Sequence, residues 1–297
     1  MKSIGALRSS EWLLIGYFVY VAAISPAFPL QSMQLWRPTA VALLVTALLA
    51  ALAYGESNEL PKVFSMARDW MPLVLTLVAY REMDWFSPIQ HDLHLELRWV
   101  QSDRAILYGL GLQRAIESTG RLLPGYLELC YAVVYAVGFF LIAILYIEHR
   151  RELVNRVVSL YLLGTLMSYA LFPYFPSDPP RIAFGGSDMP NVMTPFRELN
   201  LWLVGGYGIH SSVFPSAHVS SAFSAAWALF LFLPTHRRFA WGMLIYAVSV
   251  SVAVVYGRYH YASDAVAGFS VSLAAAGLMI LLAILRPQRP RDLPSSP

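Results

Sequence analysis

Long apolar runs separated by short polar segments occupy most of this chain. Eight runs approach the ~20 residues that a helix needs to cross a ~30 Å hydrocarbon core. They are residues 12–25, 38–54, 69–80, 126–147, 153–174, 212–233, 239–257 and 262–285. Because an unpaired backbone group in hydrocarbon costs several kcal/mol, each crossing segment must be helical. The pattern therefore predicts an all-α, polytopic membrane helix bundle of about eight spans.

The composition supports a membrane protein. Of the 297 residues, 57% are hydrophobic and 13% are charged, whereas an ordinary soluble domain has about 25% charged residues. The net charge of +3 is too small to indicate a nucleic-acid partner. No small-x-small cleavage site follows the first apolar run, so we expect an uncleaved helix rather than a signal peptide. The single cysteine, Cys130, cannot form an internal disulfide.

Basic residues gather in every second connection between the apolar runs. The turns "IEHRREL" (147–153) and "THRR" (235–238) and the tail "RPQRPR" (286–291) are the clearest cases. By the positive-inside rule, this pattern predicts a multi-pass protein of the cell membrane with cytoplasmic N- and C-termini.

The remaining connections, 81–125, 175–211 and 258–261, then lie on the outer side. The first of them is too long and too amphipathic for a plain loop. We expect it to form one or two helices that lie at the outer interface.

Three polar clusters fall on this outer side: "YFPSDPPR" (174–181), "FPSAH" (214–218) and "GRYHYASD" (257–264). His218 and His260 are separated by one predicted span that descends and another that returns. At 1.5 Å per residue the two legs are of similar length, so both histidines should lie at the same depth. The hairpin therefore predicts that the two imidazoles meet.

The third cluster has the spacing of an oriented nucleophile. His260 and Asp264 are four residues apart, so on a helix they share a face. An aspartate bound to one imidazole nitrogen fixes the tautomer and leaves the other nitrogen free as a nucleophile. His218 would then be the second histidine, placed to protonate a leaving oxygen.

The other candidate residues suit an anion. Pro215 and Ser216 resemble the start of a helix, where unpaired amides and the helix dipole favour phosphate. Arg181 and Arg258 supply positive charge and forked donors for phosphoryl oxygens. Together these residue types indicate phosphoryl transfer through a phosphohistidine, with His218, His260 and Asp264 as catalytic residues and Arg181, Ser216 and Arg258 as phosphate ligands.

"PSAH" followed by "HYASD" resembles the type 2 phosphatidic acid phosphatase and haloperoxidase superfamily. Its signature has a lysine and arginine-proline element, then Pro-Ser-Gly-His, then Ser-Arg followed by His-x-x-x-Asp. Here the first element is "PPR" with no lysine six residues earlier, and no Ser-Arg occurs near Ala253 and Val254. Both departures are similar to the inositol phosphorylceramide synthase-like, inositol phosphotransferase branch, in which the arginine elements are reduced. In that case Arg258 would replace the missing arginine.

The resemblance implies a six-helix phosphatase-type core over residues 126–285. Residues 1–125 would then hold the N-terminal spans and interfacial helices, and 286–297 a disordered cytoplasmic tail. It also implies a covalent phosphohistidine on His260 and no metal or other cofactor. The implied partners are a lipid phosphate or phospholipid substrate and the membrane; water or an alcohol as acceptor is left open.

Several plainer interpretations stay open. Asp264 and Ser216 could each only cap a helix, and "DPPR" could be a turn with a solvated arginine. His91 and His94 have a metal-like spacing but no clear third or fourth ligand. An iron site at His218, His260 and Asp264 is disfavoured, because the arginines and the helix start attract an anion. A membrane transporter and an inactive scaffold are the alternatives from other classes.

Overall fold

The computed structural model describes residues 7–28, 36–58, 61–87, 92–210 and 212–285. The elements it shows over these ranges are helices and turns, with no strand. The predicted tail, 286–297, lies outside the described residues, as does the first of the two histidines at 91 and 94.

Every predicted span is largely helical, although the span predicted from residue 212 becomes helical only at Ala217. The helices are, in chain order, α1 (Ser9–Ile24), α2 (Arg37–Glu56), α3 (Pro61–Glu82), α4 (His94–Arg104), α5 (Leu112–Glu117), α6 (Leu122–Val133), α7 (Val137–Ile147), α8 (Val154–Leu171), α9 (Pro180–Ala183), α10 (Pro195–Tyr207), α11 (Ala217–Phe232), α12 (Arg237–Tyr256) and α13 (Ala262–Leu285).

Within the described part of the chain, six stretches are long and apolar enough to cross a bilayer. They are Ser9–Ala27, Arg37–Glu56, Leu122–Ile147, Arg151–Tyr174, Pro234–Tyr256 and Ala262–Leu285. The other two predicted spans correspond to α11, which is apolar but has 16 residues, and to α3, which carries charged residues along its length. The all-α, polytopic membrane bundle is thereby confirmed.

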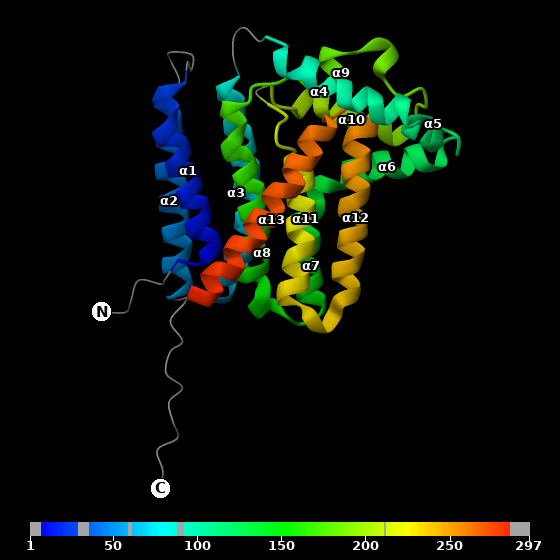
Figure 1. Cartoon of the computed structure of the whole chain (residues 1–297). Coiled ribbons are helices and arrows are strands. Elements are labelled where there is room, and N and C mark those ends of the chain that lie inside the picture. The colour runs from blue at the N-terminus through cyan, green and yellow to red at the C-terminus, as the bar shows by residue number, and fades with distance from the viewer. Residues whose placement is uncertain (1–6, 29–35, 59–60, 88–91, 211, 286–297) are drawn as a thin grey trace.

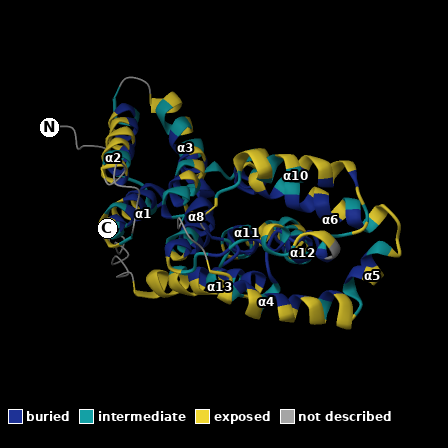
Figure 2. Cartoon of the chain, turned by 90° about the horizontal axis from the view of Figure 1, so that it is seen from above, coloured by how far each residue is buried: buried dark blue, intermediate teal, exposed yellow. Residues whose placement is uncertain are grey.

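The helices form an upright bundle with a layer of shorter helices across one end. In Figure 1, α8, α11, α12 and α13 pack around one another, while α1, α2 and α3 stand along one edge. Helices α4, α5, α6 and α10 lie across the upper end, as the view from above in Figure 2 also shows. The start of α1 and the end of α13 lie at the opposite, lower end.

The segment 81–125 contains α4 and α5, in agreement with the prediction of one or two helices. Its placement at a membrane interface stays a prediction. The predicted span 126–147 differs in shape, because a 3-10 turn at Val134–Ala136 separates α6 from α7. The buried carboxylate of Glu128 on α6 accepts hydrogen bonds from Arg197 and Asn200 of α10. These bonds hold α6 against α10, across the end of the bundle, rather than in line with α7.

Close packing of small residues sets the place of α11. Ser220 of α11 donates a hydrogen bond of 2.7 Å to the carbonyl of Gly164 on α8. A Cβ atom on Gly164 would clash with the side chain of Ser224, at 2.9 Å from its Cβ. Small residues of this kind let membrane helices approach closely. The contact fixes the start of α11, which carries His218.

Gly164→Ala should destabilise the protein, although alanine is the better helix former. The added methyl group must displace Ser224, and overpacking of this kind costs about 1–3 kcal/mol. The melting temperature of the purified protein in detergent measures the effect. Gly16→Ala is the matched control, because a Cβ there meets no atom within 4 Å; a control that melts as low as Gly164→Ala would contradict the packing argument.

Candidate active site

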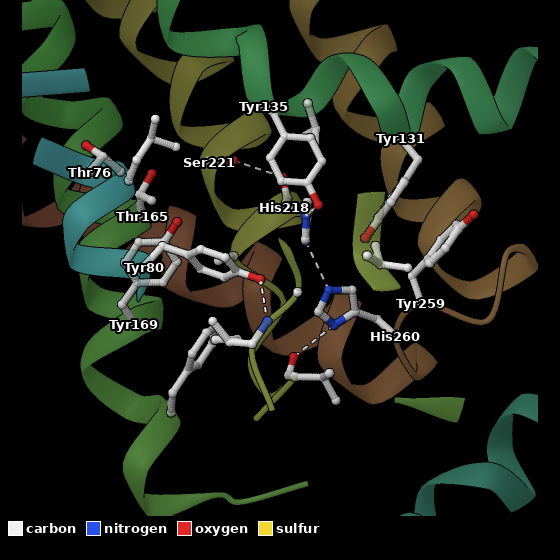
Figure 3. A pocket seen from close by; sticks show the side chains of 18 of the residues that line it. Thr76, Tyr80, Tyr131, Tyr135, Thr165, Tyr169, His218, Ser221, Tyr259 and His260 are labelled. Carbon is white, nitrogen blue, oxygen red and sulfur yellow. Dashed lines mark hydrogen bonds between the residues drawn. The ribbon is translucent and has the colours of Figure 1, made fainter. Parts of the chain in front are cut away.

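His218 and His260 meet at the upper end of the bundle, as the two-span hairpin predicts. His218 lies in the first turn of α11, and His260 lies in the segment that joins α12 to α13. Nδ1 of His218 is 3.0 Å from Nε2 of His260. Both side chains line the cavity that Figure 3 shows from close by.

The tautomer of His260 follows from its second contact. Its Nδ1 is 2.8 Å from the carbonyl oxygen of Val213, and a carbonyl oxygen only accepts. Nδ1 therefore carries the proton, and Nε2 has a free lone pair that faces His218. Burial lowers the pKa of His260 from its ordinary 6.5 to about 3, and the positive charge of Arg181 acts in the same direction. The imidazole is neutral and has the lone pair that a nucleophile needs.

Asp264 lies near His260 and also caps α13. Its Oδ2 is 3.4 Å from Nδ1 of His260 and accepts a 2.9 Å hydrogen bond from the backbone N–H of Tyr261. Its own carbonyl accepts from the N–H of Ser216 at 2.9 Å. Asp264 therefore has the contacts of both an orienting partner of His260 and a helix cap. The Val213 carbonyl is nearer to Nδ1 of His260 than the Asp264 carboxylate is.

Arg181 lies in the wall of the same cavity as the two histidines. Its guanidinium carbon is 6.0 Å from the ring centre of Tyr259. Within the described ranges, no carboxylate forms a salt bridge with Arg181. This guanidinium is therefore available to an anion in the cavity.

The geometry separates Arg258 from the cavity. Arg258 is buried, has a left-handed backbone with φ of 64°, and does not line the cavity. Its Nη1 donates to Oδ2 of Asp103 at 2.5 Å, and Oδ1 of the same aspartate accepts from the N–H of Ala262 at 2.8 Å. This arrangement favours a role in holding the 257–262 segment; phosphate binding by Arg258 stays a prediction.

Ser216 has the geometry of a helix cap. Its Oγ accepts a 3.4 Å hydrogen bond from the N–H of Val219, and its side chain is fully buried. The next residue, Ala217, is the one that lines the cavity. The start of α11 faces the cavity, while a phosphate contact through the Ser216 hydroxyl stays a prediction.

Three tyrosines around the histidines are not predicted from the sequence. Tyr135 places its hydroxyl 3.3 Å from Nε2 of His218. Tyr131 packs against His218 and stacks on Tyr259, with ring centres 3.8 Å apart. Glu128 accepts a 2.6 Å bond from the Tyr259 hydroxyl. An acidic residue inside an apolar run, as in "LELC" (127–130), is the sequence signal that points to this group.

The cavity extends from the histidines between α3, α6, α7 and α8, with a volume of about 100 Å³. Helix α3 contributes Leu73, Thr76, Leu77 and Tyr80 to its wall. Many of the side chains around it carry hydroxyl groups, namely Thr76, Tyr80, Tyr131, Tyr135, Tyr161, Thr165, Tyr169, Ser212, Ser221 and Tyr259. The site combines two imidazoles, one guanidinium and many hydroxyl groups, which suits an oxygen-rich anion.

No group of three or more His, Cys, Asp and Glu side chains is arranged to hold a metal ion in the part of the chain that the structure describes. His94 contacts Asp92 through Nδ1. Its predicted neighbour His91 lies outside the described residues.

Comparison with known proteins identifies the family. No curated protein and no solved structure matches the chain. A family model described as PAP2 superfamily matches residues 103–278, which is more than half of the chain and includes both histidines, Asp264 and Arg181. The chain therefore belongs to the PAP2 superfamily.

Proposed function

We propose that this protein is an integral-membrane lipid phosphatase or phosphotransferase that acts through a phosphohistidine on His260. The observation that carries the proposal is the pair of imidazoles at 3.0 Å, with Nδ1 of His260 occupied by the Val213 carbonyl. Membership of the PAP2 superfamily supports phosphatase or phosphotransferase chemistry. The active site would face the extracytoplasmic side, opposite the basic turns and both termini.

In the first step, the lone pair on Nε2 of His260 attacks the phosphorus atom. The bond from phosphorus to the leaving oxygen breaks as the P–N bond forms. His218 must be protonated for this step, which the negative charge of the bound phosphoryl group favours, and it gives its proton to that oxygen. The direct contact between the two rings must open for this step, because the phosphoryl group has to lie between them.

In the second step, water or an alcohol attacks the phosphorus. His218, now neutral, takes the proton of the attacking oxygen, and the P–N bond breaks to restore Nε2 of His260. The positive charge of Arg181 and the dipole at the start of α11 stabilise the phosphoryl oxygens in both steps. The histidine pair thus acts first as nucleophile and acid, and then as leaving group and base.

The charge in the cavity favours a phosphodiester head-group transferase as the second candidate. Among the described residues that line the cavity, Arg181 is the only arginine or lysine, and Arg258 is paired with Asp103. One guanidinium balances the single negative charge of a phosphodiester better than the two charges of a phosphomonoester. This argument is consistent with the inositol phosphorylceramide synthase-like branch, where the acceptor is an alcohol.

His260→Ala should abolish turnover of lipid phosphates, and His218→Ala should do nearly the same. Asp264→Asn should lower kcat by a factor on the order of 10²–10⁴, by analogy with the loss of an orienting triad aspartate. Purified variants in mixed micelles are assayed with ³²P-labelled phosphatidate, prenyl pyrophosphate and phosphatidylinositol. Free phosphate, or inositol phosphate from phosphatidylinositol, indicates a hydrolase; with a lipid alcohol added as acceptor, a new labelled lipid indicates a transferase.

Rapid quenching of the same reactions tests the intermediate. A phosphoramidate is labile in acid and stable in alkali, so label should stay on the wild-type protein only under alkaline conditions. Asp264→Asn is the control for the fold, because an amide oxygen can still accept from Tyr261. Full activity of His260→Ala with a wild-type melting temperature would end the proposal.

Arg181 and Arg258 should respond differently to substitution. Arg181→Gln should raise KM and lower kcat/KM by about 10²-fold, the size of a lost charged donor at a transition state, and should leave the melting temperature almost unchanged. Arg258→Gln should mainly lower the melting temperature, because it leaves the buried Asp103 carboxylate without its positively charged partner. The reverse pattern would place Arg258 at the phosphate.

The stability of the protein should depend on pH through His260. Its folded pKa, about 3, lies below the ordinary 6.5, so protons bind more readily to the unfolded chain between these values. The folded state should therefore lose stability as pH falls from 6.5 towards 3. The melting temperature should drop less steeply over this window in His260→Gln than in the wild type; equal slopes would mean that the imidazole is protonated in the folded protein.

A further inference from the structure

Helix α4 touches all three polar segments that meet at the site. Its Glu96 accepts a hydrogen bond from the backbone N–H of Asp178, three residues before Arg181. Its Trp99 stacks on Phe214, just before α11, with ring centres 5.0 Å apart. Its Asp103 binds the segment that carries His260 through two hydrogen bonds. Figure 1 shows α4 lying across the end of the bundle, above the helices that supply the chemistry.

The segment that carries Arg181 has few backbone donors, although the carbonyl of Asp178 also accepts a 3.0 Å hydrogen bond from the Tyr261 hydroxyl. Pro179 and Pro180 have no backbone N–H, so only Asp178 and Arg181 have backbone donors in this stretch. The N–H of Asp178 donates to Oε1 of Glu96 at 2.7 Å. The N–H of Arg181 donates to the carbonyl of Arg258 at 3.0 Å.

Both of these N–H groups are connected to α4, one directly and one through Arg258. Glu96 holds Asp178 directly. The second anchor is the carbonyl of Arg258, whose guanidinium is held by Asp103. Glu96 and Asp103 are both fully buried, with 0% of each exposed, so their hydrogen bonds are protected from competing water.

We propose that Glu96 and Asp103 are positioning residues that hold the Arg181 guanidinium against the phosphoryl group. Neither side chain lines the cavity, so each acts through the backbone of another segment. The proposal rests on the proposed function only in assigning a phosphoryl ligand to the cavity. It assigns a function to the long connection 81–125. Through α4, this connection would hold the segment that carries Arg181 and the segment that carries His260 in a fixed relative position.

The test is a double-mutant cycle between Glu96 and Arg181. Glu96→Ala should weaken the binding of inorganic phosphate about tenfold, as measured by competitive inhibition and by calorimetry. It should also raise KM more than it lowers kcat. In the Arg181→Gln background the same substitution should have almost no further effect on phosphate affinity, because the guanidinium that Glu96 positions is already absent. A role in stability alone would lower the melting temperature equally in both backgrounds and leave phosphate affinity unchanged.

Conservative variants keep the test informative if Glu96→Ala does not fold. Glu96→Gln keeps an oxygen that accepts from Asp178, so it should retain most of the phosphate affinity. Asp103→Asn combined with Arg258→Gln removes both buried charges together and should fold, yet bind phosphate less tightly than wild type. Gln101→Ala, exposed on the same helix, should behave as wild type.

The outcomes separate this inference from the proposed function. Wild-type phosphate affinity in folded Glu96→Ala overturns the positioning role, whatever the activity of the histidine variants. Full additivity between Glu96→Ala and Arg181→Gln overturns it as well. Turnover in His260→Ala would instead remove the phosphohistidine mechanism, while the phosphate-binding result would still stand.

Discussion

The hydrogen bond from Nδ1 of His260 to the carbonyl of Val213 governs the chemistry of this site. A neutral imidazole has one proton, so occupying Nδ1 leaves the lone pair on Nε2, where His218 faces it. The segment that carries Val213 is itself held on two sides. Ser212 donates to the carbonyl of Phe175 at 2.5 Å, and the N–H of Ile209 donates to the hydroxyl of Tyr80 at 3.2 Å. The position of the Val213 carbonyl oxygen therefore depends on α3 and on the segment that follows α8.

Burial makes this arrangement effective. In a buried site of low dielectric, a charged imidazole is costly, so the ring stays neutral and its lone pair is not lost to protonation near neutral pH. The same burial strengthens the contact between the Arg181 charge and an incoming phosphate. Asp264 adds a carboxylate 3.4 Å from Nδ1, which would stabilise the ring when a P–N bond gives it positive charge. In the proposed mechanism, the carbonyl sets the resting tautomer and the carboxylate would support the charged intermediate.

Periodicity and span length were sufficient to predict the bundle and the meeting of the two histidines. These features depend on local hydrophobicity and on the fixed rise of a helix. The partner of Arg258 could not be predicted, because Asp103 lies 155 residues away in the chain and no local pattern links them. Tyr131 and Tyr135 resemble ordinary aromatic residues of a membrane interface until the turn at Val134–Ala136 brings them to His218.

Under the proposed function, the chemistry and the selection of substrate would come from different parts of the chain. The histidines, Asp264 and Arg181 lie within residues 103–278, the range that matches the family. Leu73, Thr76, Leu77 and Tyr80 of α3 lie outside this range and yet line the same cavity. Phosphoryl transfer needs only a few groups around one phosphorus atom, whereas recognition of the rest of the proposed lipid substrate needs a larger surface of cavity-lining side chains. Because Tyr80 of α3 also accepts from the N–H of Ile209, a change in that surface would alter both the shape of the cavity offered to the proposed substrate and how firmly the Val213 carbonyl is held.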